Sequence, residues 1–366
     1  MSISAKQSSV IDIFRCYLPI LVVAFHTSSI NGASVSHGVE TYLRLAICKL
    51  GEIAVPAFFV ISGYLFFINL EKWNRKVWGV KIKKRVRTLL VPFLIWIVID
   101  FAAKFVCGIL KSEIDGFSLA ALGEFFAQLG GLRIFWDRPI QEYVSSIFAY
   151  SVDISKPIDV PMWYVRDLLV MVLLSPIVWK TLKFARIYAL VVLCLIYILF
   201  IGFPFVLVTP TALFFFSLGA YFSVYGQSCI ERFGKFRVLS YLLSLALFVL
   251  TSFVRDSLMG DIMLRLFVIV SVVAVFNLVS DLYDRGLRPV GVLTDSSFFI
   301  YASHAVLITE ISNFLLWRIL PITAEWMLVL KVFLRPAVAV GICLFIFVAM
   351  RKICPKTLGA LTGGRF

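Results

Sequence analysis

The sequence predicts an all-α, polytopic integral membrane protein with about ten transmembrane helices and both termini in the cytoplasm. Of its 366 residues, 61% are hydrophobic and 15% are charged. That charged fraction is about ten percentage points below the value for soluble domains. A soluble chain of this length cannot bury so much apolar surface in one or two cores. The composition therefore excludes a soluble enzyme, a secreted disulfide scaffold and a disordered chain.

Ten apolar runs account for this composition, each close to the length of about 20 residues that crosses a bilayer as a helix. They lie near residues 10–30, 52–70, 88–108, 163–179, 187–202, 205–224, 238–254, 262–280, 296–317 and 326–349. The first run is too long for a signal peptide and contains Asp12, Arg15 and His26, so we expect it to be retained. Only a turn around Gly202 and Pro204 separates the fifth and sixth runs, which predicts a helical hairpin.

The basic residues determine the predicted orientation. The 35 Lys and Arg outnumber the 21 Asp and Glu and gather between apolar runs, a pattern that favours membrane topology and anionic ligands over nucleic acid. Residues 71–88 hold eight Lys and Arg, whereas residues 109–162 form one long, acidic outer loop. The positive-inside rule then places both termini in the cytoplasm. We interpret 1–366 as a single membrane-embedded domain without an appended soluble domain.

The seven cysteines are interpreted as small buried hydrophobic residues. They are scattered, mostly within apolar runs, and form no C-x-x-C pair. This pattern predicts neither a metal site nor a disulfide framework.

Ionisable residues inside a span are costly and mark functional candidates. Arg15 and His26 of the first run are 11 residues apart, which places them on one helix face, roughly 16 Å apart along the axis. Pro19 lies between them and leaves the Arg15 carbonyl without its helical partner, a feature tolerated where a helix lines a cavity. Two structural alternatives stay open: Asp12 could pair with Arg15, and His26 could simply bond to a neighbouring helix.

Several segments follow one another in the order seen in a known family. The first run carries D-x-x-R, ten further residues and a histidine, and the second contains FFVISG from Phe58 to Gly63. Later segments read KKRVRTLLVP, MWYVRDLLVMVLLSP, FFFSLGAYF and SSFFIYASH. From about residue 10 to 305, the chain thus resembles the acyltransferase-3 family of integral membrane acyltransferases, which O-acylate cell-envelope polysaccharides.

The resemblance implies an O-acyl transfer across a bacterial inner membrane. The donor is an acyl-CoA, usually acetyl-CoA as a co-substrate, with no permanently bound cofactor. The acceptor is a hydroxyl of a glycan or lipid-linked glycan, and membrane lipids surround the protein, whose oligomeric state stays open. Arg15 and His26 are then catalytic: Arg15 grips the donor or an oxyanion, and His26 is either the base for the acceptor hydroxyl or a transient acyl carrier.

Donor-binding candidates follow from the same resemblance. Lys84, Arg85 and Arg87 are expected to bind the phosphates of the donor, although these charges could serve membrane topology alone. The family often shows Arg-x-x-Arg here, and Lys84 and Arg87 are its nearest equivalent. Tyr301 and His304 are further candidates for donor binding, with a helix–helix hydrogen bond as the alternative for His304.

Aromatic residues supply the acceptor-binding candidates. Trp163 and Tyr164 could pack on the apolar face of a sugar, or belong to an interfacial aromatic belt. The adjacent Arg166–Asp167 is interpreted as a structural ion pair, and Ser62 is expected to serve close helix packing rather than nucleophilic attack.

Two other classes of function compete with an acyltransferase. A multi-pass transporter or exporter of polysaccharide or a small solute would also contain intramembrane charges, but the chain lacks repeated halves with matching broken helices. A non-catalytic assembly subunit would not need Arg15 and His26 on one helix face.

Overall fold

A computed structural model of the protein describes residues 4–28, 38–70, 73–111, 116, 118–136, 138–139, 155–199, 208–254, 257–320 and 324–366. The predicted hairpin turn at Gly202 and Pro204 lies outside these residues. The described part is helical apart from two short strands that pair antiparallel, β1 (Arg138–Pro139) and β2 (Ser155–Lys156).

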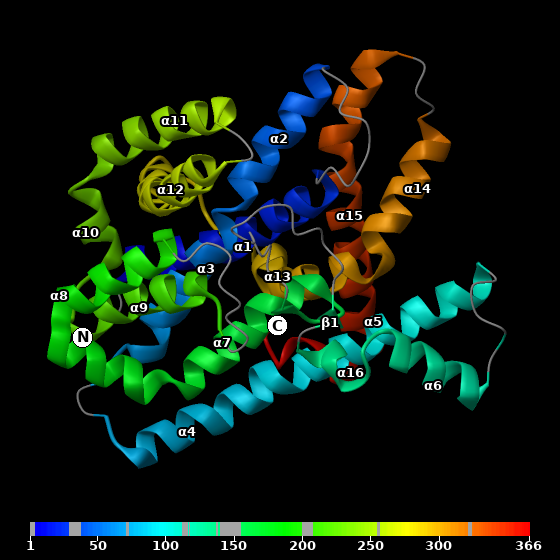
Figure 1. The fold of residues 1–366 in the computed structure, drawn as a ribbon, viewed down its shortest axis with the longest axis horizontal. Helices are drawn as coiled ribbons and strands as arrows, with labels where there is room; N and C mark the ends of the chain where they lie inside the picture. The colour runs from blue at the N-terminus through cyan, green and yellow to red at the C-terminus, as the bar shows by residue number, and fades with distance from the viewer. Residues whose placement is uncertain are drawn as a thin grey trace.

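In the described residues, sixteen α-helices form a bundle in which α4 runs along the lower left edge of the view in Figure 1. They are α1 (Ala5–Ser28), α2 (Val39–Gly51), α3 (Ala54–Phe67), α4 (Arg75–Arg85), α5 (Val91–Leu110), α6 (Leu119–Gln128), α7 (Trp163–Leu173), α8 (Ser175–Leu199), α9 (Pro210–Val224), α10 (Cys229–Gly234), α11 (Arg237–Phe253), α12 (Leu258–Asp284), α13 (Gly291–Ser303), α14 (Thr309–Ile319), α15 (Glu325–Ile353) and α16 (Pro355–Thr362). Two π turns, η1 (Val86–Leu90) and η4 (His304–Ile308), and two 3₁₀ turns, η2 (Gly131–Phe135) and η3 (Val160–Met162), join some of them.

The helices have the lengths and composition of a multi-pass membrane protein. Seven helical segments of the described part are long and apolar enough to cross a membrane, and α9 and α11 are apolar but shorter. Large apolar side chains such as Phe184 of α8 and Leu245 of α11 remain exposed, as expected where lipid is the solvent. The described residues of each predicted apolar run are mostly helical, while the number of ten spans and the sidedness of the termini stay predictions.

Three element boundaries differ from those expected. The helix α2 precedes the second predicted run and joins it in one segment, Val39–Phe67. The helix α8 bridges the fourth and fifth runs, but Arg186 breaks it with a φ of 49° and a ψ of −128°. The ninth run consists of two helices because η4 interrupts it, with Leu307 at a φ of 61°. None of these breaks occurs at proline, so local composition gives little warning of them.

The helices α3 and α9 cross in backbone contact. A Cβ atom at Gly63 would lie 2.0 Å from the carbonyl oxygen of Phe216, and one at Gly219 would lie 1.9 Å from that of Val60. Only glycine permits this approach, which is typical of small residues between membrane helices. The contact explains why both apolar motifs contain a glycine.

A buried ion pair fixes the start of α7. The Nε and Nη2 atoms of Arg166 donate to Oδ1 of Asp167 at 2.9 and 2.8 Å, and both side chains are at most 1% exposed. The other carboxylate oxygen of Asp167 accepts from the backbone N–H of Thr209, at the start of α9 (2.9 Å). The pair therefore holds α7 against α9, as expected for a structural ion pair.

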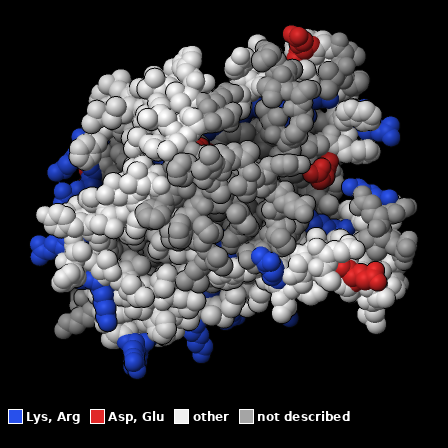
Figure 2. Space-filling model, in the orientation of Figure 1, with Lys and Arg blue, Asp and Glu red and all other residues white. Residues whose placement is uncertain are grey.

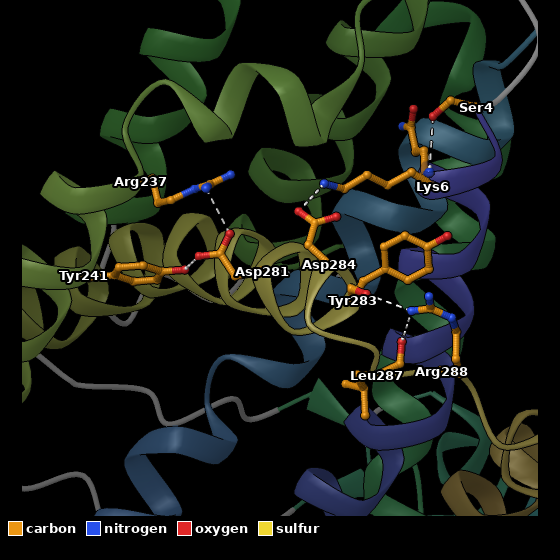
Figure 3. Close-up of polar contacts among 10 residues, drawn as sticks. Ser4, Lys6, Arg237, Tyr241, Asp281, Tyr283, Asp284, Leu287 and Arg288 are labelled. Atoms are coloured by element: carbon orange, nitrogen blue, oxygen red, sulfur yellow. Dashed lines mark hydrogen bonds and ion pairs between the residues drawn. The ribbon is translucent and has the colours of Figure 1, made fainter.

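Polar contacts also hold the first turn of α1. Lys6 donates to Asp284 at the end of α12 (2.7 Å), and one turn earlier Asp281 accepts from Arg237 and Tyr241 of α11 (3.0 and 2.9 Å) (Figure 3). On the face drawn in Figure 2, Lys and Arg dominate the lower left edge, where α4 lies in Figure 1. We call the end of the bundle that carries α4 and the start of α1 the basic end.

Candidate functional site

A cavity of about 460 Å³ opens between α1, α3, α7 and α13. Arg15, Arg85 and Arg365 line it together, and we call it the arginine cavity. Its other lining residues are Pro19, Phe58, Ile61, Ser62, Leu65, Leu89, Tyr164, Val165, Leu168, Thr294, Asp295, Ser297, Phe298 and Tyr301. Three guanidinium groups in an otherwise largely apolar wall make this cavity suited to an anion.

The positive charge of the arginine cavity is only partly neutralised. Arg15 pairs with Asp12 at 3.0 Å, so this predicted pair forms although Arg15 also lines the cavity. The lining carboxylate of Asp295 pairs with Arg351 at 3.1 Å. In the described part of the chain, neither Arg85 nor Arg365 has an ion pair with a carboxylate. Desolvated guanidinium groups without counter-ions favour binding of an anionic ligand.

Arg365 is a lining residue that the sequence did not indicate. Its guanidinium lies 4.4 Å from the ring centroid of Phe298, and its Nη2 donates to the carbonyl oxygen of Thr88 at 2.8 Å. That carbonyl belongs to the π turn η1, against which Gly363 packs so closely that a Cβ would lie 2.4 Å from it. Burial, and next the charge of Arg85, lower the pKa of Arg365 to about 10, which leaves the group charged at neutral pH.

The donor-binding candidates fall into two groups. Arg85 and Tyr301 line the arginine cavity, and the hydroxyl of Tyr301 donates to the carbonyl oxygen of Pro161. Lys84 and Arg87 are exposed and do not line the cavity. His304 is fully buried and does not line it either.

A second, smaller cavity of about 200 Å³ surrounds His26, and we call it the histidine cavity. Trp163 and Glu52 line it with His26, so one of the two acceptor-binding candidates lies beside the predicted catalytic group. The other candidate, Tyr164, lines the arginine cavity instead and shares a hydrogen bond of 2.9 Å with Ser62.

The two cavities follow one another along the same three helices. On α1, Arg15 and Pro19 line the first, and Val22 and His26 line the second. Likewise, α3 and α7 contribute neighbouring residues to both. Since 11 residues of helix span roughly 16 Å, the two cavities lie one after the other along that length of α1, with Arg15 toward the basic end and His26 at the other end.

A chain of aromatic rings lies between the cavities. The ring centroids of Tyr164 and Tyr301 are 5.8 Å apart, those of Tyr301 and His304 are 6.3 Å apart, and those of His304 and His26 are 5.2 Å apart. These rings come from α7, α13, η4 and α1, so distant segments of the chain meet here.

The described residues contain no group of three or more His, Cys, Asp or Glu side chains that could hold a metal ion. All seven cysteines are unpaired with one another, and Cys16, Cys229 and Cys343 are buried. Guanidinium, imidazole, carboxylate, hydroxyl and aromatic groups line the two cavities.

Comparison with known proteins identifies relatives of the chain. Residues 9–350 match the model of the acyltransferase-3 family, which is described as an acyltransferase domain. The chain is also 25% identical over 344 residues to the succinoglycan biosynthesis protein ExoH of Rhizobium meliloti (strain 1021), covering 90% of this chain and 84% of that protein. No solved structure matches the chain. The family match favours an enzyme over the transporter and assembly-subunit alternatives.

Proposed function

The chain belongs to the acyltransferase-3 family, and we propose that it moves an acetyl group from cytoplasmic acetyl-CoA to a sugar hydroxyl of a cell-envelope polysaccharide or its lipid-linked precursor. The relative ExoH is named for the biosynthesis of a polysaccharide, succinoglycan, which supports a glycan as the acceptor. The bacterial inner membrane is the proposed location, with the basic end in the cytoplasm as the positive-inside rule requires.

The observation that carries this proposal is the succession of the arginine cavity and the histidine cavity along α1. In the proposed complex, Arg15, Arg85 and Arg365 bind phosphates of the donor, because guanidinium groups recognise phosphate through paired N–H donors. The phosphopantetheine arm then extends along α1. An extended arm measures on the order of 16 Å, as does the axial distance from Arg15 to His26, so the thioester would reach the histidine cavity.

His26 is the proposed proton-transfer group. As base, it takes the proton from the acceptor hydroxyl while that oxygen attacks the thioester carbonyl carbon. The carbon–sulfur bond breaks, and His26 returns the proton to the leaving thiolate, which gives the ester and free CoA. As acyl carrier, the imidazole would itself attack the thioester first. Trp163, in the same cavity, offers an aromatic face to the apolar side of a sugar ring.

Transfer of labelled acetyl groups tests this function. Purified protein in liposomes, given labelled acetyl-CoA and a lipid-linked glycan, should produce acetylated acceptor. His26→Ala should insert and fold normally but lose activity. Retention of more than about a tenth of wild-type activity, equivalent to a barrier change of only ~1.4 kcal/mol, would exclude an essential role for His26. Donor uptake into the liposomes without any acylated product would instead favour a transporter.

A further inference from the structure

His304 occupies a place that donor binding does not explain. It is 0% exposed and does not line the arginine cavity. Its ring centroid lies 5.2 Å from that of His26, with the two planes inclined at 43°. Two imidazoles joined by one N–H···N hydrogen bond have centroids about 5 Å apart, because each nitrogen lies about 1 Å from its ring centre and the bond spans about 3 Å. The separation of the two centroids therefore equals that of a directly bonded pair, which a rotation of the His26 ring would form.

Backbone carbonyls determine which nitrogen of His304 carries the proton. Nδ1 lies 2.8 Å from the carbonyl oxygen of Tyr301 and 3.2 Å from that of Ile300. A carbonyl oxygen can only accept, so Nδ1 is the donor and the neutral ring keeps its lone pair on Nε2. Nε2 is buried and has no hydrogen-bond partner among the described residues. A buried acceptor without a hydrogen-bond partner lowers the stability of the folded protein, so its presence calls for an explanation.

The backbone beside His304 is also unusual. The helix α13 ends at Ser303, and η4 begins at His304 itself. Leu307 adopts a left-handed φ of 61°, and Val306 leaves helical geometry with a ψ of 80°. The carbonyl oxygen of His304 accepts from the backbone N–H of Thr309 and from the Thr309 hydroxyl, the latter at 2.8 Å. Strained backbone and π turns concentrate at functional sites.

We propose that His304 is a positioning residue for His26. In this arrangement, which rests on the proposed function, Nε2 of His304 accepts the N–H of one His26 nitrogen. The other His26 nitrogen then keeps its lone pair toward the acceptor hydroxyl. When His26 takes the hydroxyl proton, it becomes an imidazolium whose second N–H still donates to His304. His304 itself neither gains nor loses a proton, and the proton on His26 passes to the thiolate as the carbon–sulfur bond breaks.

Steady-state kinetics separate positioning from donor binding. His304→Ala should lower kcat by ~100-fold, the scale of general base catalysis, and change the donor KM by less than about threefold. His304→Gln places an amide oxygen as an acceptor near the site of Nε2 and should recover at least ~10-fold of that loss. Ser303→Ala is the matched control, because this adjacent buried side chain donates to Cys343 at 3.4 Å and to no other described residue; its kcat should stay within about twofold of wild type.

A spectroscopic measurement does not depend on turnover. The chain has 3 histidines, so ¹⁵N-histidine labelling in a His37→Asn background leaves two imidazoles to observe. The ¹⁵N shifts of His26 should report one tautomer in the parent and a mixture of tautomers in His304→Ala, with the single tautomer restored in His304→Gln. This readout tests the His26–His304 contact even in a variant that has lost activity.

The outcomes separate this inference from the proposed function. If the parent protein transfers no acyl group, the proposed function fails, whatever the tautomer of His26. If the parent is active and His26→Ala is inactive, but His304→Ala keeps more than half of kcat and leaves the His26 tautomer unchanged, the inference alone is overturned. A raised donor KM at constant kcat in His304→Ala would overturn it in favour of donor binding.

Discussion

Replacing Arg365 by alanine tests whether the arginine cavity is the donor site. The change removes one of three guanidiniums from the cavity wall, together with its hydrogen bond to Thr88 and its contact with Phe298. A charge-assisted hydrogen bond contributes about 1.5–3 kcal/mol, which corresponds to a factor of about 10 to 150 in affinity. Part of the loss is offset because Arg85 no longer faces a second unpaired cation. We therefore expect CoA to bind about tenfold more weakly.

The assay compares cavity arginines with basic residues outside the cavity. Calorimetric titration of CoA into detergent-solubilised protein gives the Kd at two salt concentrations. Arg365→Ala and Arg85→Ala should both weaken binding, whereas Arg87→Ala, at an exposed position in the same basic segment, should change Kd by less than about threefold. Equal losses in all three variants would mean that only the general positive charge of the basic end matters, and the cavity assignment would be refuted.

Three further predictions concern the supporting structure. Gly219→Ala should destabilise the protein by about 1–3 kcal/mol in thermal unfolding in detergent, because the new Cβ would overlap the backbone of α3; Gly79→Ala, with open space around it, should have little effect, and equal midpoints would refute the close crossing. Asp167→Ala should cost about 3–5 kcal/mol because it leaves Arg166 buried without its carboxylate; a loss below about 1 kcal/mol would contradict that role. Burial, and next the charge of Asp100, raise the pKa of Asp159 well above its usual range, so the folded state binds this proton more tightly than the unfolded state. The stability that this proton contributes is present below the unfolded pKa of about 3.9 and is lost as pH rises through the folded pKa; Asp159→Asn should flatten this dependence of the unfolding midpoint, and an unchanged slope would disprove the assignment.

The helices and the alignment of the candidate site along the first helix could be predicted from the sequence, because both depend on short-range periodicity. The spacing of Arg15 and His26 alone placed both side chains along one side of α1, where the structure has two successive cavities. Close helix packing around Ser62 and the structural Arg166–Asp167 pair were also predicted from the sequence. These signals lie within single helices or between immediate neighbours, where the α-helical repeat is a sufficient guide.

What the sequence did not indicate depends on contacts between distant segments. Arg365 reaches the arginine cavity only because Gly363 packs against η1, about 275 residues earlier in the chain. The place of His304 beside His26 coincides with the start of the π turn η4, a segment that contains neither proline nor glycine. The sequence does not distinguish the three basic residues Lys84, Arg85 and Arg87 from one another. The helical phase of α4 and η1 brings Arg85 to the cavity wall and leaves the other two outside it. Tertiary packing decides such choices, and local propensity does not.

The most direct test of the central claim is acyl transfer between two separated compartments. In proteoliposomes of known orientation, acetyl-CoA is supplied only at the face that bears α4, and the glycan acceptor only at the opposite face. The account predicts acetylated acceptor. With the nucleotide of the donor bound near Arg15 and its thioester at His26, the acyl group would reach the opposite face of the bilayer while the nucleotide stays behind. Product that forms only when both substrates share one compartment would contradict it.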